Sequence, residues 1–203
     1  MVDKIKRISS RSIIAGTALV LVSLFILTGM VSFARETMAR NDGSLYQYTV
    51  DSTDLTWSGI EYRNGHLMTT DNDPQMIFEK QQKFTSLRFY MEASIYPGEM
   101  VVYYTEPGDA GFSAHKRLWI TPADETGWYY VETTMKNVTS LRVDPTMYRG
   151  NIVTFGDFIF NEDKTFTDYF EITPNHIFNL VVYTGIISSV LKFLQEILKK
   201  EID

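Results

Sequence analysis

The sequence contains no cysteine, which excludes disulfides, thiolate metal sites and cysteine nucleophiles. Histidine is scarce, and the three residues His66, His115 and His176 lie far apart with no carboxylate at a metal-ligand spacing. No serine lies in the strand–turn–helix motif of a hydrolase nucleophile, and no carboxylate pair is marked for glycoside hydrolysis. The sequence therefore predicts a protein that is not an enzyme and that needs no cofactor.

Charge is absent from residues 12–34, the stretch between Arg11 and Arg35. As a helix, this stretch would reach roughly 34 Å, enough to cross a bilayer core of about 30 Å. Ser32 and Ala34 offer a small-x-small cleavage site, but the apolar run exceeds the usual core of about 7–15 residues in a signal peptide. We predict an uncleaved transmembrane helix over residues 12–34.

Acidic residues are almost missing from residues 1–11, where four Lys and Arg stand against Asp3 alone. The positive-inside rule places such a segment in the cytoplasm and the chain beyond the span outside. The sequence thus predicts a single-pass protein of the cell membrane, with a cytoplasmic N-terminus, a juxtamembrane linker at 35–43 and an extracytoplasmic main domain.

Basic residues are also in the minority outside the membrane. Residues 41–175 carry 10 Lys and Arg against 20 Asp and Glu, a net charge of −10. An acidic surface repels a phosphate backbone, so nucleic acid is not expected as a partner.

Alternating apolar and polar residues, typical of half-buried strands, fill residues 44–173. In residues 87–96, for example, Leu87, Phe89, Met91, Ala93 and Ile95 share one face. The expected strands are 45–50, 56–62, 75–80, 87–96, 100–106, 117–121, 127–133, 139–144, 152–160 and 165–172. Short strands without helical pattern between them predict a mainly β fold, a jelly-roll-like β-sandwich.

Turn residues separate these strands. Asn64-Gly65 is a strong hairpin signal because both residues tolerate positive φ. Pro145 and Gly150 break the stretch 141–160, so its first run is expected to point Leu141 and Val143 inward before a closing strand.

Helical periodicity returns in the tail, residues 174–203. From Ile186 onward the apolar residues occupy one arc of a helix, and Ser, Lys, Gln and Glu fill the other. This amphipathic helix could lie at the membrane interface, pack on a partner helix, or cross back as a second span. Lys192 and the adjacent Ser188-Ser189 pair favour the first two alternatives.

Aromatic side chains are the main candidates for ligand binding, since an exposed ring can stack on the C–H face of a sugar. Tyr104, Trp119, Tyr129 and Trp57 lie in expected strands or at their ends, where each ring either binds ligand or fills the core. Acidic turns at 71–73 and 162–163 supply oxygen ligands that would suit calcium, although no calcium-loop motif is present.

A resemblance rests on five segments in order: DNDPQMIFE, LRFYMEASI, VVYYTEPGDAGFS, GWYYVETTMKNVTSLRVDP and GNIVTFGDFIF. They resemble an exported β-sandwich domain of bacterial cell-envelope polysaccharide proteins, which is often fused to membrane glycosyltransferases. That domain is similar to galactose-binding-like folds and carbohydrate-binding modules. The resemblance covers about residues 70–160, and the chain lacks the catalytic domain of the fused proteins.

The resemblance implies a non-enzymatic accessory protein in the membrane. Its domain would bind or guide envelope polysaccharide beside a partner in the bilayer, such as a glycosyltransferase or a second copy of the chain. The alternative is an assembly subunit that builds a membrane complex without binding glycan.

Overall fold

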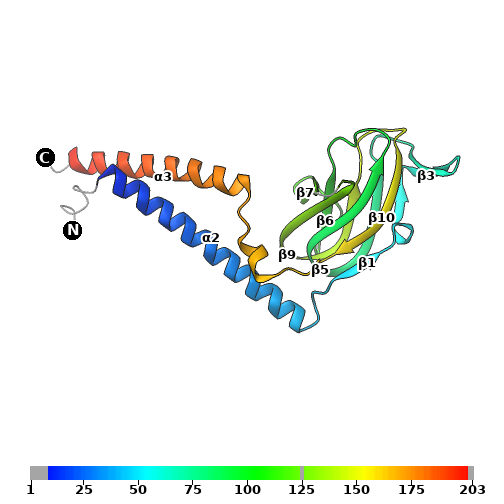
Figure 1. Ribbon diagram of the computed structural model, residues 1–203, viewed down its shortest axis with the longest axis horizontal. Helices are drawn as coiled ribbons and strands as arrows, with labels where there is room; N and C mark the ends of the chain where they lie inside the picture. The colour runs from blue at the N-terminus through cyan, green and yellow to red at the C-terminus, as the bar shows by residue number, and fades with distance from the viewer. Residues whose placement is uncertain (1–8, 124–125, 201–203) are drawn as a thin grey trace. The chain divides into compact units, whose positions relative to one another are not determined.

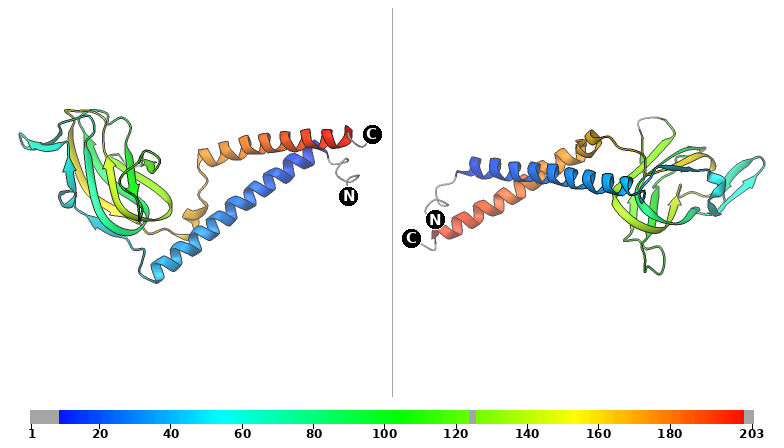
Figure 2. Two further views of the ribbon diagram at one scale, coloured as in Figure 1. Left: turned by 180° about the vertical axis from the view of Figure 1, so that it is seen from behind. Right: turned by 90° about the horizontal axis from the view of Figure 1, so that it is seen from below.

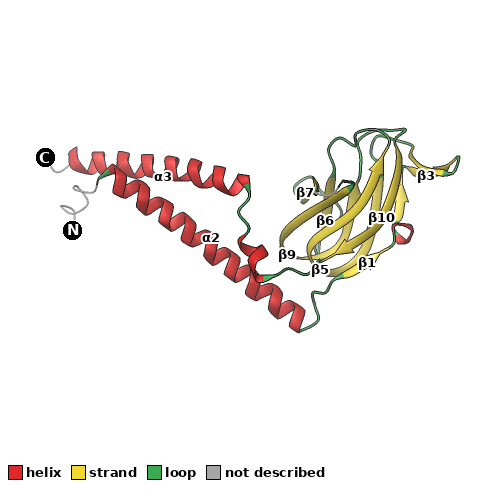
Figure 3. Cartoon of the chain, in the orientation of Figure 1, coloured by secondary structure: helices red, strands yellow, loops and turns green. Residues whose placement is uncertain are grey.

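The computed structural model describes residues 9–123 and 126–200. The chain divides into two compact units, and each is described here by itself. Residues 1–34 and 164–203 form the helical unit, and residues 35–163 form the β unit. Helices and strands are distinguished by colour in Figure 3.

The elements follow one another as in Figure 1. The helices are α2 (Ser10–Asn41), the 3₁₀ helix η2 (Phe166–Phe170) and α3 (Pro174–Lys200), with a further 3₁₀ turn, η1 (Ser52–Asp54), in the β unit. The strands are β1 (Tyr48–Val50), β2 (Thr56–Ser58), β3 (Ile60–Arg63), β4 (His66–Thr69), β5 (Gln75–Ala93), β6 (Val101–Thr105), β7 (Arg117–Trp119), β8 (Thr121–Pro122), β9 (Trp128–Asp144) and β10 (Ile152–Phe160).

The two long helices of the helical unit coincide with the long apolar segments of the sequence. Both α2 and the segment from η2 through α3 are long and apolar enough to cross a membrane, judged by length and composition alone. The expected helix at 12–34 and the expected tail helix are both present as helices.

The strands of the β unit pair antiparallel throughout, in the order β3-β4-β10-β5-β9-β6-β7, and β1, β2 and β8 add to β10, β5 and β9. The mainly β prediction is therefore confirmed. β5 and β9 pair along almost their whole lengths and form the centre of the sheet, which curls around its core in Figure 2.

The two ends of β5 and β9 belong to different layers. The first part of β5 pairs with β2 and with the end of β9. This end of β9 also pairs with β6, which pairs with β7. The last part of β5 pairs with β10 and with the start of β9. The apolar side chains of both layers meet in one buried cluster, which includes Met76, Val102 and Leu141 from one layer and Phe89 and Phe158 from the other. The two layers of the expected sandwich are thus continuous through these strands.

Bulges let one strand serve both layers. The register between β5 and β9 shifts between Glu79 and Gln82 and again between Phe84 and Ser86. Because side chains alternate with a period of two, an extra residue moves the next set to the other face. Along β5 the large buried side chains are even-numbered from Met76 to Phe84 and odd-numbered from Leu87 to Met91, so the face changes at the second shift.

Several turn and strand predictions hold. Asn64 and Gly65 have φ of 51° and 85° and join β3 to β4 in a hairpin. Leu141 and Val143 point into the core. Ile95, expected on the buried face, is exposed because β5 ends at Ala93.

The segment 165–172, expected as the last strand, instead contains η2. Its capping box explains the difference. The backbone N–H of Thr165 donates to the Asp168 carboxylate at 2.6 Å, and the first turn closes from the Asp168 N–H to the Thr165 carbonyl at 3.2 Å. These local hydrogen bonds compete with strand pairing.

The expected linker at 35–43 is also largely helical, since α2 continues to Asn41. Arg40 secures this end to the β unit. Its guanidinium donates to the carbonyls of Asn161 and Glu162, both at 3.0 Å, and pairs with the Asp163 carboxylate. The chain therefore enters the β unit through a bonded helix end.

We predict that Phe158→Ala will destabilise the β unit by about 3–5 kcal/mol, since it leaves a cavity where a fully buried ring stacks on Phe89 at 4.9 Å. Urea unfolding of the detergent-solubilised chain, followed by tryptophan fluorescence, measures this because all three tryptophans lie in the β unit. Tyr62→Ala, which truncates an exposed ring on β3, should leave the midpoint nearly unchanged.

Candidate carbohydrate site

Polar and aromatic side chains line up across the outer face of the layer β2-β5-β9-β6-β7. Residues directly opposite each other in an antiparallel pair point to the same side. The register therefore places Thr56, Ile77, Arg142, Tyr103 and Arg117 in one row, on the face opposite the core residues Val102 and Leu141. The next row contains Asp144, Val101 and Trp119.

Arg142 organises the middle of this face. Its guanidinium donates to both carboxylate oxygens of Asp144 and to Asp73, each at 2.7 Å, and lies 4.9 Å from the centre of the Tyr103 ring. Burial raises the pKa of Asp144, and the hydrogen bonds from Arg142 offset part of that rise. The network fixes both carboxylates and holds the Tyr103 ring in place.

Trp119, in the second row of this face, also lines a cleft of about 350 Å³. The lining residues, here called the Trp119 cleft, are Tyr96, Pro97, Gly98, Glu99, Met100, Trp119, Ile120, Pro122 and Tyr129. Trp119 is 48% exposed, and the guanidinium of Arg117 lies 4.7 Å from the centre of its indole ring. Tyr96 is still more exposed, whereas Met100 and Ile120 belong to the core. Aromatic residues beside acidic and basic ones suit sugars, because rings meet C–H groups while charged groups meet hydroxyls.

Buried hydrogen bonds hold the loop that carries Tyr96. The carboxamide of Asn151, fully buried, accepts from the Ile95 N–H at 3.0 Å and from the Ser94 hydroxyl at 3.1 Å, and donates to the Ile95 carbonyl at 3.1 Å. These bonds fix the chain just before the cleft wall begins.

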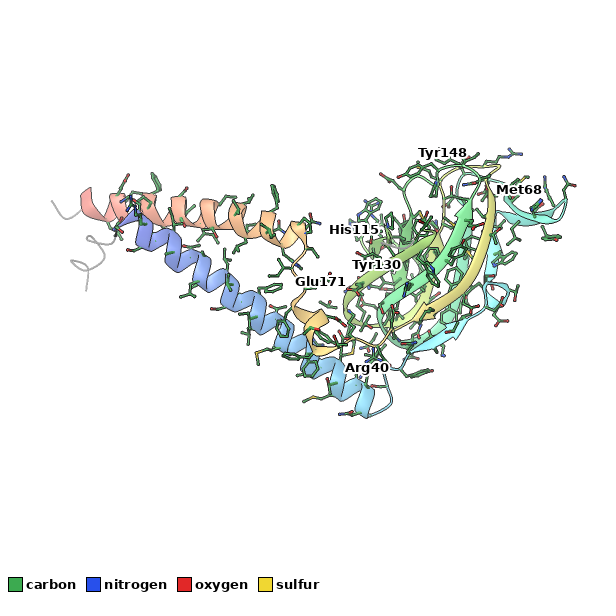
Figure 4. All side chains as sticks on the ribbon, in the orientation of Figure 1. Arg40, Met68, His115, Tyr130, Tyr148 and Glu171 are labelled. Atoms are coloured by element: carbon green, nitrogen blue, oxygen red, sulfur yellow. The ribbon has the colours of Figure 1, made fainter. Side chains whose placement is uncertain are left out.

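Gly98 lets that loop pack closely against Met147 and Tyr148. It has φ of 77°, and a Cβ there would lie 2.6 Å from Met147 and 3.1 Å from the ring of Tyr148. Gly98 thus places the cleft beside Tyr148, and Figure 4 shows Tyr148 at the end of the β unit opposite Arg40.

The structure brings together two of the four aromatic candidates, Trp119 and Tyr129, in the cleft. Tyr129 also stacks on Phe89 at 5.8 Å, so the cleft wall rests on the core. Tyr104, only 8% exposed, belongs to the core. Trp57 packs against the core, and its Nε1 donates to the Ser52 carbonyl at 2.9 Å.

Two aromatic residues of this region are not among the four site residues chosen from the sequence. Tyr103 takes the outward position next to Tyr104, which strand alternation alone cannot assign when both neighbours are tyrosine. Tyr96 follows the end of β5 and precedes Pro97-Gly98, a turn signal that could have marked an exposed ring.

Three of the four carboxylates proposed for calcium pair with arginines, and the fourth, Asp71, accepts from the Asp73 N–H at 2.8 Å. Asp73 pairs with Arg142 at 2.7 Å, and Glu162 with Arg88 at 3.2 Å, while Asp163 pairs with Arg40. Among the described residues, no group of three or more His, Cys, Asp or Glu side chains gathers in a way that could hold a metal ion.

Comparison with known proteins gave no matching family and no matching curated protein. Solved structures similar to the chain include a family 29 carbohydrate-binding module at 12% identity, covering 64% of this chain and 99% of that one with a TM-score of 0.42. A family 6 carbohydrate-binding module from Clostridium cellulolyticum, in complex with xylose, has 10% identity over 57% of this chain and 97% of its own, with a TM-score of 0.39. A low-affinity xylan-binding module from Roseburia intestinalis has 8% identity over 57% and 94%, with a TM-score of 0.37. With TM-scores this low, the functional argument rests on the geometry of the chain itself.

We predict that Arg142→Met will destabilise the β unit by about 2–3 kcal/mol at neutral pH, because it leaves the buried Asp144 carboxylate without its cation. The pKa of Asp144 should then rise further. A raised pKa in the folded state lowers the free energy of unfolding only above the unfolded-state pKa of about 3.9, where the carboxyl ionises on unfolding. The stability lost in the Arg142→Met variant should therefore shrink as pH falls toward about 3.5. Urea unfolding at both pH values measures this.

Arg149→Met, which removes an exposed guanidinium from a nearby turn, is the matched control. An Arg142→Met penalty that is the same at both pH values would contradict a role in neutralising Asp144.

Proposed function

We propose that the chain is a membrane-anchored, non-enzymatic carbohydrate-binding protein whose β unit holds polysaccharide in the Trp119 cleft. The observation that carries this proposal is the exposed Trp119, which lines one cleft together with Tyr96, Tyr129 and the acidic residue Glu99. Sugar rings would stack on these aromatic faces, and Glu99 and Arg117 would bind the hydroxyl groups.

The setting of the cleft supports a binding role. Its walls are preorganised by the Asn151 hydrogen bonds and by the stacking of Tyr129 on Phe89. A ligand that meets a prearranged site loses less free energy to ordering the protein.

Membrane attachment is the second part of the proposal. It rests on the apolar helices and on the basic residues that precede α2, which favour a cytoplasmic N-terminus and an extracytoplasmic β unit. The bound polymer would be a polysaccharide of the cell envelope. The sequence resemblance adds a membrane glycosyltransferase as the protein partner beside which the chain would guide this polymer.

The direct test is calorimetric titration of the detergent-solubilised full chain with envelope polysaccharide from its source organism and with soluble β-glucan and xylan. We expect saturable binding to at least one of these polymers. Trp119→Ala should weaken it about tenfold or more, equivalent to roughly 1.4 kcal/mol, because the stacking surface is lost.

Tyr62→Ala removes an aromatic ring that is even more exposed than Trp119 from β3, at the opposite end of the strand order from β7, and should leave the affinity unchanged. If the folded chain binds none of these polymers, or if both variants bind as well as the parent, carbohydrate binding at this cleft is wrong. An assembly subunit would then be the better description.

A further inference from the structure

Burial in the helical unit is the reverse of that in a water-soluble protein. Among its described residues, the buried ones are Thr17, Gly29, Ser188 and Gln195, all of them small or polar. The large apolar side chains of the two helices point outward. They include Leu19, Leu24, Leu27, Met30, Ile177, Phe178, Val181, Ile186, Val190, Phe193 and Leu194. In water this arrangement would expose a large apolar surface and enclose polar groups, which soluble proteins avoid.

The polar face of α3 turns toward α2. Thr184, Ser188 and Lys192, one helical turn apart, line a groove whose other wall includes Ser10, Ile13 and Ala18 of α2. The hydroxyls of Thr184 and Ser188 are buried there with no hydrogen-bond partner. A helix lying at a membrane surface would turn this face to water, whereas a helix within the bilayer turns its polar residues toward another helix.

The two helices run antiparallel with their charged residues at matching levels. Ser10, near the start of α2, lines the same groove as Lys192, near the end of α3, and Phe25 of α2 lies 5.2 Å from His176. Residues 174–191 hold no Asp, Glu, Lys or Arg and extend along α2 for about 27 Å, close to a bilayer core of about 30 Å. Arg11 and Lys192 then lie together at one boundary.

Aromatic residues gather at the other boundary. Phe33 of α2 meets Phe166 and Tyr169 of η2, with ring centres 5.0 and 5.5 Å apart. Gly29 allows this approach, because a Cβ there would lie 2.7 Å from the Phe170 ring and from the Tyr169 carbonyl. Aromatic belts at the membrane–water interface and small residues where helical segments meet are both typical of membrane proteins.

We propose that α3 is a second membrane span, packed antiparallel to α2, with the apolar surfaces of both helices covered by lipid acyl chains. Both chain ends then lie on the same side of the membrane, opposite the β unit. Ser188 turns inward, and the exposed Ser189 hydroxyl donates to the Gly185 carbonyl of its own helix at 2.8 Å, so the serine pair no longer opposes a span. Lys192 lies at the boundary, where its ammonium can reach the headgroups. This inference rests on the membrane attachment proposed above.

The absence of cysteine permits a clean topology test. Single cysteines are placed in the full chain at Ser9, just before α2, at the exposed Ser113 of the β unit and at the C-terminal Asp203. Each variant is expressed in bacterial cells and treated with a membrane-impermeant maleimide, before and after the membrane is permeabilised. We expect Ser113→Cys to be labelled in intact cells, and Ser9→Cys and Asp203→Cys only after permeabilisation.

The outcomes separate the two proposals. If Asp203→Cys is labelled under the same conditions as Ser113→Cys, α3 does not cross and the inference is wrong, while an anchor through α2 survives. If the ends are labelled in intact cells and Ser113→Cys is not, the hairpin is supported and the proposed orientation fails. Carbohydrate binding is measured separately and is independent of either result.

Depth within the bilayer gives an independent test. Val181 is 67% exposed and lies near the middle of the uncharged part of α3. A bimane fluorophore on Val181→Cys, in the chain reconstituted into phosphatidylcholine vesicles, should be quenched most by lipids brominated near the ends of their acyl chains. Stronger quenching by bromines near the headgroup, or by aqueous iodide, would place α3 at the surface and overturn the proposal. The same fluorophore on Ser113→Cys, quenched by iodide alone, is the control.

Discussion

The pairing of β5 with β9 is the constraint on which the β unit depends. Each strand must bury apolar side chains in two layers, yet a regular strand presents one fixed face. The register shift between Phe84 and Ser86 resolves this conflict on β5, since its large buried side chains are even-numbered up to Phe84 and odd-numbered from Leu87. Strand β9 then supplies both parts of the candidate site, Arg142 and Asp144 at one end and Tyr129 at the other.

The two units sort their side chains by opposite rules. The β unit buries Phe, Met, Leu and Val and keeps most of its charges outside, as expected in water. The helical unit exposes such apolar residues and encloses Thr17, Ser188 and Gln195. One chain therefore carries surfaces suited to two solvents, and the change occurs within α2, whose last turns are bonded to the β unit through Arg40.

Local patterns predicted much of this arrangement. Alternation identified Leu87, Phe89 and Met91 as core, and Asn64-Gly65 as a hairpin, because each depends on neighbours in sequence. The continuity of β5 and β9 was not predictable, since polar runs such as 81–83 look like loops. They remain within a strand only because bulges keep β5 paired with β9, which is distant in sequence. Only part of the cleft could be predicted from the sequence. Trp119 and Tyr129 could be named as candidates, but whether a ring meets solvent depends on which strand lies next to it in space.

The position of β7 explains why Trp119 is accessible. β7 has only three residues and ends the strand order, so no further strand of that order lies beside it. Short edge strands also limit pairing with other chains, and the guanidinium of Arg117 beside the indole places a charge at this edge. A ring at a sheet edge can be approached from the side as well as from above. A polymer could therefore pass the cleft without threading, and the Asn151 bonds would keep the opposite wall in place while it does so.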